Sequence, residues 1–236
     1  MKALVITIAG NEQSKSAADR CIESSKSNDN EFEIEKFKAT IPEEVKNILM
    51  QRGIVWNYPW TGEELDLKSG MLKSAYETAD PLKRIACFLS HWRLWNVVAS
   101  VSEPRIILEH DAIFTSKVDV DSLVNSRYQI IGLNNPIGAT RQSQRFHEMI
   151  QSAEIELPGV VPVPTIDKDQ VPQGLAGNSA YMIKPEGARK LLKAVRDFGA
   201  WPNDAIMCKQ LLPGVLGCSK PYYTAIQAGL TSSTTR

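Results

Sequence analysis

The amino-terminal part of the chain alternates short apolar runs with amphipathic stretches. Residues 3–9 (ALVITIA) form a continuous apolar run rich in β-branched side chains, which is typical of a strand covered on both faces. Residues 14–25 place their apolar side chains on one side of a helix, and residues 32–37 alternate apolar and charged side chains like a half-buried strand. The order strand, helix, strand predicts an α/β domain with a mostly parallel central sheet flanked by helices.

Two further helices have recognisable starts. Residues 40–43 (TIPE) have the form of a capping box, and Gly53 ends the helix that they begin. Asp80 followed by Pro81 is an N-cap and a first-turn proline, and this helix should extend to about residue 100. Both helices continue the α/β pattern.

The rest of the chain is less regular. Pro185 begins a helix that ends near Gly199, and Asn203 begins a short one. Apolar runs predict strands at residues 105–108, 128–133, 175–183 and 222–226. Residues 134–174 mix Pro, Gly, Ser, Gln and Asp without a period, so we interpret them as a lid or a flexible loop.

Composition limits the class of protein. Of the 236 residues, 43% are hydrophobic and 23% are charged, so the chain is not wholly disordered and can form one large domain or two small ones. It has neither an internal repeat nor a linker between two cores, and we expect a single domain over residues 1–236. Lys and Arg total 27 against 27 for Asp and Glu; this balance gives no strong nucleic-acid signal.

The sequence also bears on the compartment. Its apolar runs fall short of the roughly 18 residues that a transmembrane helix needs. The four cysteines are scattered without a C-x-x-C pair, which argues against a zinc site and favours free thiols in a reducing compartment. The sequence therefore predicts a cytoplasmic protein without a transmembrane segment.

The feature that carries chemistry is Glu109-His110-Asp111, directly after the apolar residues 105–108. In open α/β sheets, ligands bind beyond the carboxyl ends of the strands, and carboxylates are the ligands that Mg²⁺ and Mn²⁺ prefer. The alternative is an ordinary polar turn, which is our interpretation of the second acidic triplet at residues 119–121 (DVD).

The surroundings of this triplet resemble glycosyltransferase family 25, which includes bacterial lipopolysaccharide galactosyltransferases and collagen β-galactosyltransferases. That family has a helix reading G-C-x-x-S-H-x-x-x-W and then a strand reading I-L-E-D-D. The positions that match here are Cys87, Ser90, His91, Trp95, Leu108, Glu109 and Asp111. Ala86 replaces the usual glycine, and His110 replaces the middle acid.

The resemblance extends over most of the chain in the same order. Residues 5–8 (VITI) and Arg20 are similar to the first strand of the family and to the arginine of its first helix. Residues 177–192 are similar to its G-x-x-x-Y block, and residues 202–204 (PND) to the P-x-D that follows. Gln227 and Ser232 match the glutamine and serine near the end of the family pattern.

The resemblance implies a GT-A fold, a nucleotide-sugar donor that is usually UDP-linked, Mn²⁺ or Mg²⁺ as cofactor, and inversion at the anomeric carbon. Asp111 and Glu109 are expected to hold the metal, and Asp204 to act as the general base. Asn178 and Ser179 are expected to contact the acceptor or the sugar. The residues expected to bind the nucleotide-sugar are Thr7, Arg20, Arg84, Ser90, His91 and Glu109.

These assignments have structural alternatives. An acid such as Asp204 is favoured at a helix start by the helix dipole alone, His91 is also consistent with a structural histidine, and Arg20 with a solvated helix charge. His110 in place of an acid removes one negative charge. This loss should weaken metal binding or shift its preference toward Mn²⁺ over Mg²⁺.

We expect residues 1–118 to form the nucleotide-sugar side and residues 119–236 the acceptor side. The family resemblance implies transfer of galactose or glucose to a hydroxyl in a glycan, a lipopolysaccharide or a similar acceptor. A lipid-linked acceptor would place the protein at the membrane periphery. Two other functions remain open: a catalytically degenerate protein that binds a nucleotide-sugar or a glycan, and another α/β enzyme of the nucleotidyltransferase type. The chain contains neither G-x-x-x-x-G-K nor G-x-G-x-x-G, which argues against a P-loop enzyme and a dinucleotide oxidoreductase.

Overall fold

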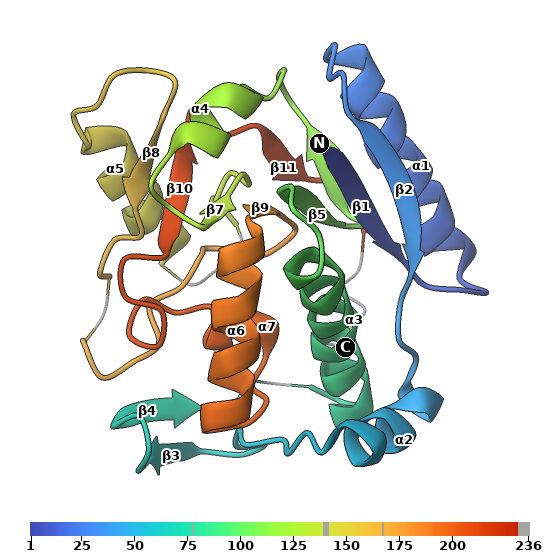
Figure 1. Cartoon of the computed structure of the whole chain (residues 1–236), viewed down its shortest axis with the longest axis vertical. Coiled ribbons are helices and arrows are strands. Elements are labelled where there is room, and N and C mark those ends of the chain that lie inside the picture. The colour runs from blue at the N-terminus through green and yellow to red at the C-terminus, as the bar shows by residue number, and fades with distance from the viewer. Residues whose placement is uncertain (77, 139–141, 167, 231–236) are drawn as a thin grey trace.

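A seven-stranded sheet forms the centre of the protein (Figure 1), in a computed structural model that describes all residues except 77, 139–141, 167 and 231–236. Its strand order is β2 (Glu33–Lys38), β1 (Lys2–Thr7), β5 (Arg105–Glu109), β9 (Ala180–Ile183), β7 (Ile130–Gly132), β10 (Leu216–Lys220) and β8 (Gly159–Pro162). The strands β9 and β8 run opposite to the other five. The predicted fold class, an α/β domain with a mostly parallel sheet flanked by helices, is confirmed.

Helices cover both faces of the sheet (Figure 1). They are α1 (Glu12–Ser27), α2 (Pro42–Arg52), α3 (Pro81–Ala99), α4 (Val120–Asn125), α5 (Ser143–Ser152), α6 (Pro185–Phe198) and α7 (Asn203–Ile206). Alternate residues of β5 enter two cores because successive strand side chains point to opposite faces. Ile107 joins the core under α3 and α6, whereas Ile106 and Leu108 join the core under α1 and α4.

Two small sheets complete the fold. They pair β3 (Glu63–Asp66) with β4 (Met71–Ser74), and β6 (Ala112–Phe114) with β11 (Thr224–Ile226). The first hairpin was not predicted, and neither were α5 and β8, which lie inside residues 134–174. The prediction that these residues form a lid, and the division into a donor half and an acceptor half, remain predictions. Ser232 of the family pattern lies outside the described residues.

The helix starts follow their sequence signals with one exception. Asp80 caps α3 by accepting from the Leu82 amide at 2.9 Å, as predicted. The predicted capping box at residues 40–43 is wrong. Thr40 donates its amide to Ser90 Oγ at 2.9 Å, and the side chain that closes the first turn is that of Glu44, which accepts from the Ile41 amide at 3.2 Å.

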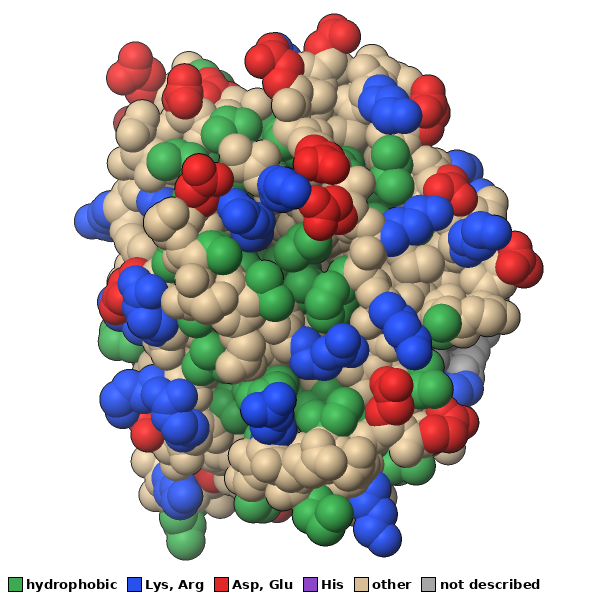
Figure 2. All heavy atoms as spheres, turned by 45° about the vertical axis from the view of Figure 1, so that its right-hand side comes forward, with side chains coloured by type: hydrophobic (Ala, Val, Ile, Leu, Met, Phe, Trp, Pro, Cys, Tyr) green, Lys and Arg blue, Asp and Glu red, His purple; other side chains and the backbone are tan. Residues whose placement is uncertain are grey.

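Charges of both signs are interspersed on the face seen in Figure 2, in agreement with a formal net charge of zero. Among the described residues, no helix combines the length and apolar character that a bilayer span requires.

Candidate active site

A cavity of about 730 Å³ opens beyond the carboxyl ends of β1 and β5, in the size range of small-molecule sites. Its walls come from α3, the turn after β5, the segment before β9 and the start of α7. Eight of the ten residues predicted for the site line it: Arg84, Ser90, His91, Glu109, Asp111, Asn178, Ser179 and Asp204. Thr7 and Arg20 are not among the lining residues.

The acidic pair lies on a sharp turn. The strand β5 ends at Glu109, the next two residues form the turn, and β6 begins at Ala112. Burial and the negative charge of Glu109 raise the pKa of Asp111 to about 7. One carboxylate oxygen of Asp111 is buried without a hydrogen-bond partner in the described structure, although the neighbouring Ser179 side chain partly offsets the rise in its pKa. The turn therefore holds a carboxylate that the protein satisfies only in part.

Glu109 is held by a buried hydrogen-bond relay. Trp95 Nε1 donates to the Tyr181 hydroxyl at 2.9 Å, which lies 2.9 Å from His91 Nδ1. Because the Glu109 carboxylate only accepts, His91 donates to its Oε1 from Nε2 at 3.1 Å. In the tautomer with its proton on Nε2, Nδ1 is an acceptor and takes the Tyr181 hydroxyl proton. Burial opposes ionisation of Glu109, but the bond from His91 and the neighbouring basic groups, with Arg84 the last of them, outweigh it, so that its pKa is lowered.

One atom each of Cys87, His91 and Glu109 lies within 4.8 Å of the others, which makes these residues a second candidate ligand set for a metal. The thiol of Cys87 is a weak candidate because burial, with the charge of Glu109, raises its pKa well above the ordinary value. It also faces Asn203 Oδ1 at 3.7 Å. Both ring nitrogens of His91 already have partners. The oxygens of Glu109 and Asp111 are therefore the better ligands for a hard cation.

A second wall of the cavity carries Asp204, in the first turn of α7. Burial raises the pKa of Asp204, although the positive charge of Arg84 opposes this rise. Arg84 stacks on the Tyr76 ring with the guanidinium carbon 5.2 Å from its centroid. Asp204 Oδ1, Arg84 Nε and both amide atoms of Asn178 are buried without hydrogen-bond partners in the described structure. Native proteins rarely leave such atoms unpaired, so this wall is suited to a polar ligand.

The other predicted residues have partners within the protein. Ser90 donates to the Ala86 carbonyl at 2.8 Å and accepts from Thr40, so its hydroxyl fixes the loop before α2 on α3. Thr7 Oγ1 donates to the Val5 carbonyl at 3.3 Å. Arg20 donates to Gln227 Oε1 at 2.8 Å and to Ser16 Oγ at 2.9 Å.

Gly174 allows the segment before β9 to approach α7. A Cβ atom there would lie 2.6 Å from the Met207 carbonyl oxygen and 2.8 Å from that of Asp204. We expect Gly174→Ala to displace α7, to cost about 1–3 kcal/mol and to lower Tm by about 2–12 °C, with a loss of activity. Gly132→Ala is the control, because the nearest atoms to its added carbon belong to the flexible end of the Leu175 side chain, at 3.1 Å and beyond. Wild-type Tm and activity in Gly174→Ala would contradict this account of the close approach.

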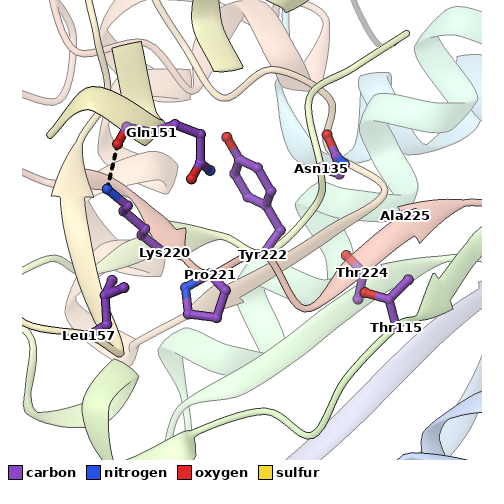
Figure 3. A pocket seen from close by; sticks show the side chains of 9 residues that line it. All are labelled: Thr115, Asn135, Gln151, Leu157, Lys220, Pro221, Tyr222, Thr224 and Ala225. Carbon is purple, nitrogen blue, oxygen red and sulfur yellow. Dashed lines mark hydrogen bonds between the residues drawn. The ribbon is translucent and has the colours of Figure 1, made fainter. Parts of the chain in front are cut away.

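A smaller hollow of about 280 Å³ lies at the carboxyl end of β10. Figure 3 shows the Tyr222 ring between Gln151 and Asn135, with Lys220 Nζ donating to the Gln151 carbonyl at 2.6 Å. None of the residues that line this hollow is acidic. Tyr222 and Thr224 each leave a buried hydroxyl without a partner in the described structure, but the paired acids line the larger cavity, which we therefore take as the candidate active site.

The fold and the cavity together define a class of protein: α/β enzymes that bind a polar ligand beside acidic groups at a strand end. The family model described as "Glycosyltransferase family 25 (LPS biosynthesis protein)" matches residues 14–207. The chain belongs to this family, and it is a glycosyltransferase. No curated protein matches the chain.

Solved structures with a similar fold are distant. Mouse xyloside xylosyltransferase 1 is 10% identical over 91% of this chain and 83% of that chain, with a TM-score of 0.41. The galactosyltransferase LgtC, in complex with donor and acceptor sugar analogues, is 10% identical over 92% and 73%, with a TM-score of 0.42. The glycosyltransferase GlyE of Streptococcus pneumoniae TIGR4 is 10% identical over 92% of this chain but only 45% of its own, with a TM-score of 0.40.

Proposed function

We propose that this glycosyltransferase is metal-dependent and inverting, with a GT-A-like active site. It moves a hexose, galactose or glucose, from a UDP-linked donor to a hydroxyl of a glycan, a lipopolysaccharide or a similar acceptor. We place it in the cytoplasm, where a lipid-linked acceptor would bring it to the membrane periphery. The observation that carries the proposal is the buried, unpartnered oxygen of Asp111 beside Glu109.

The acidic turn suits a divalent cation. Burial and the neighbouring Glu109 charge disfavour ionisation of Asp111, and a bound cation would reverse that penalty by supplying positive charge to both carboxylates. The residues that would hold it are Asp111 and Glu109, whose oxygens match the preference of Mn²⁺ and Mg²⁺. When bound, the metal neutralises negative charge on the diphosphate leaving group.

His110 bears on the choice of metal. Burial lowers its pKa although Glu109 opposes this, so its ring is neutral at neutral pH and supplies no negative charge to the turn. With only two acidic residues, Glu109 and Asp111, at this strand end, we propose Mn²⁺ rather than Mg²⁺, because imidazole suits transition metals better than Mg²⁺.

Arg84 and Asp204 have separate tasks. The charge of Arg84 contributes to the lowered pKa of Glu109 and opposes the rise that burial causes in the pKa of Asp204. This guanidinium can also pair with donor phosphate oxygens. Asp204 accepts the proton of the acceptor hydroxyl while the oxygen of that hydroxyl forms the new bond to the anomeric carbon and the diphosphate leaves. Its raised pKa makes it a stronger base than an ordinary aspartate. Asn178 offers an unpartnered amide to the hydroxyls of either sugar.

A thermal-shift screen of nucleotide-sugars tests the proposal before the acceptor is known. With Mn²⁺ present and a donor at about 100 times its Kd, ligand linkage stabilises the protein by about 2.7 kcal/mol, or about 5–10 °C in a chain of this size. We expect this shift for one UDP-hexose and a smaller one without Mn²⁺. An equal shift with and without the metal would contradict metal dependence.

His110 in place of an acid favours a second candidate, a protein that binds the nucleotide-sugar without transferring it. Slow release of free sugar from the stabilising donor separates the two functions. An enzyme hydrolyses its donor slowly in the absence of acceptor, whereas a binding protein returns it intact.

A further inference from the structure

Gln227 binds the backbone of the acidic turn, by which we mean residues 109–112. Its backbone N–H donates to the Asp111 carbonyl at 2.8 Å. Its side-chain nitrogen donates to the carbonyls of His110 at 3.1 Å and Ala112 at 3.0 Å. The carbonyls of three consecutive residues therefore accept from one glutamine, which is itself only 7% exposed. The side-chain nitrogen also lies 2.9 Å from the Ala17 carbonyl of α1. Because it carries two N–H groups, the carbonyls of Ala17, His110 and Ala112 share two protons, and the turn is linked to a helix.

Arg20 determines which end of this amide faces the turn. Its Nε donates to Gln227 Oε1 at 2.8 Å, and its Nη1 donates to Ser16 Oγ at 2.9 Å. Because a guanidinium only donates, it requires the amide oxygen to point toward it. The amide nitrogen must then point toward the carbonyls of His110 and Ala112. Arg20 does not line the cavity, so its route to the donor site runs through Gln227.

We propose that Gln227 is a positioning residue for the carboxylates of Glu109 and Asp111, and that Arg20 acts through Gln227 rather than on the donor. Without the amide, the carbonyls of Ala17, His110 and Ala112 lose their shared donor. The turn then relaxes toward other partners, and the backbone that carries the two carboxylates is no longer held in place. The expected effect on metal affinity rests on the proposed metal site at Glu109 and Asp111, but the order of the turn does not.

The experiment measures Mn²⁺ affinity without donor in Gln227→Met, Arg20→Met and the double variant. We expect about tenfold weaker binding in Gln227→Met and a smaller loss in Arg20→Met. The double variant should bind no more weakly than Gln227→Met, since residues that act through one contact are not additive. Arg20 is exposed, so its variant folds even if Gln227→Met does not.

Gln173→Met is the matched control. Gln173 is 6% exposed and likewise bridges backbone groups. It accepts from the Ile166 amide at 3.0 Å and donates to the Val171 carbonyl at 3.2 Å, and neither of these two partners is among the residues that line the cavity. This control should lower Tm without changing Mn²⁺ affinity.

A second measurement separates failure of this inference from failure of the proposed function. Hydrogen exchange over residues 109–114, in metal-free protein, should be faster in both the Gln227 and the Arg20 variants and unchanged in Gln173→Met. Wild-type exchange in both variants would overturn the positioning role, and additive losses of Mn²⁺ affinity would overturn the route from Arg20 through Gln227. If wild-type protein binds no Mn²⁺, the proposed metal site fails, while faster exchange in the two variants would still support the role of Gln227.

Discussion

Asp111→Asn is expected to abolish Mn²⁺-dependent turnover and, at the same time, to raise the Tm of the metal-free protein. The first effect follows because Asn removes a charged ligand oxygen from the proposed metal site. The second follows because burial and the charge of Glu109 raise the pKa of Asp111 to about 7, against about 3.9 for an ordinary aspartate. Ionised Asp111 then costs up to about 4 kcal/mol of folding free energy at about 1.36 kcal/mol per pKa unit.

The pH dependence of this gain has a definite sign. A raised carboxyl pKa destabilises the folded state as pH rises from about 4 to about 7, and the cost stays constant above that range. The gain in Tm from Asn should therefore be largest at pH 8 and should disappear near pH 4. Thermal melts without metal measure it, and Asp121→Asn, an exposed acid of the other triplet, is the control. A lower Tm for Asp111→Asn at pH 8 would show that the ionised Asp111 carboxylate does not destabilise the metal-free protein.

Asp204→Asn is expected to reduce sugar transfer about 10²–10⁴-fold, the usual contribution of a general base. Binding of donor and metal should persist, because the proposed metal ligands lie at the end of β5 and in the turn after it, whereas Asp204 lies on α7. Donor-dependent thermal shifts and transfer rates, measured on the same preparations, separate the two roles. Equal loss of donor binding in the Asp111 and Asp204 variants would show that Asp204 belongs to the donor site.

The pH–rate profile gives a second test of the base. Since burial raises the pKa of Asp204, kcat at saturating metal and donor should fall, as pH decreases, at a pH above the ordinary range of aspartate. The Asn variant should lack this acid limb. An acid limb that survives in Asp204→Asn would assign the base to another residue.

The parts of the fold and site that depend on local sequence are predictable. The strand before Glu109 and the cap at Asp80 are read from a few neighbouring residues, and both lie where expected. The sequence did not predict the hairpin of β3 and β4, because a charged residue such as Lys73 is not expected at a buried strand position. It is buried there because it has partners such as Glu64, at 2.9 Å. An isolated strand pattern does not reveal such a pairing.

The missed parts of the site depend on contacts between residues far apart in the chain. Tyr181 orients His91 from 90 residues away, and Gln227 reaches the turn from a distance of more than 110 residues. Resemblance to the family marks Gln227 as a matching position, but the sequence does not show that its partners are backbone carbonyls. Arg20 illustrates the same limit, because its contact with Gln227 appears only in the folded protein.

Gln227 lies late in the sequence, so it is synthesised after the acidic turn that it contacts. The residues of β5 and the turn after it are synthesised before β9, which pairs with β5 in the folded chain. Gln227 is synthesised later still. A fragment that ends at residue 118 would contain both carboxylates but neither the neighbouring strand nor the amide that secures them. Residues 1–118 therefore carry the proposed metal ligands without the contacts from β9 and Gln227 that hold them in the folded chain.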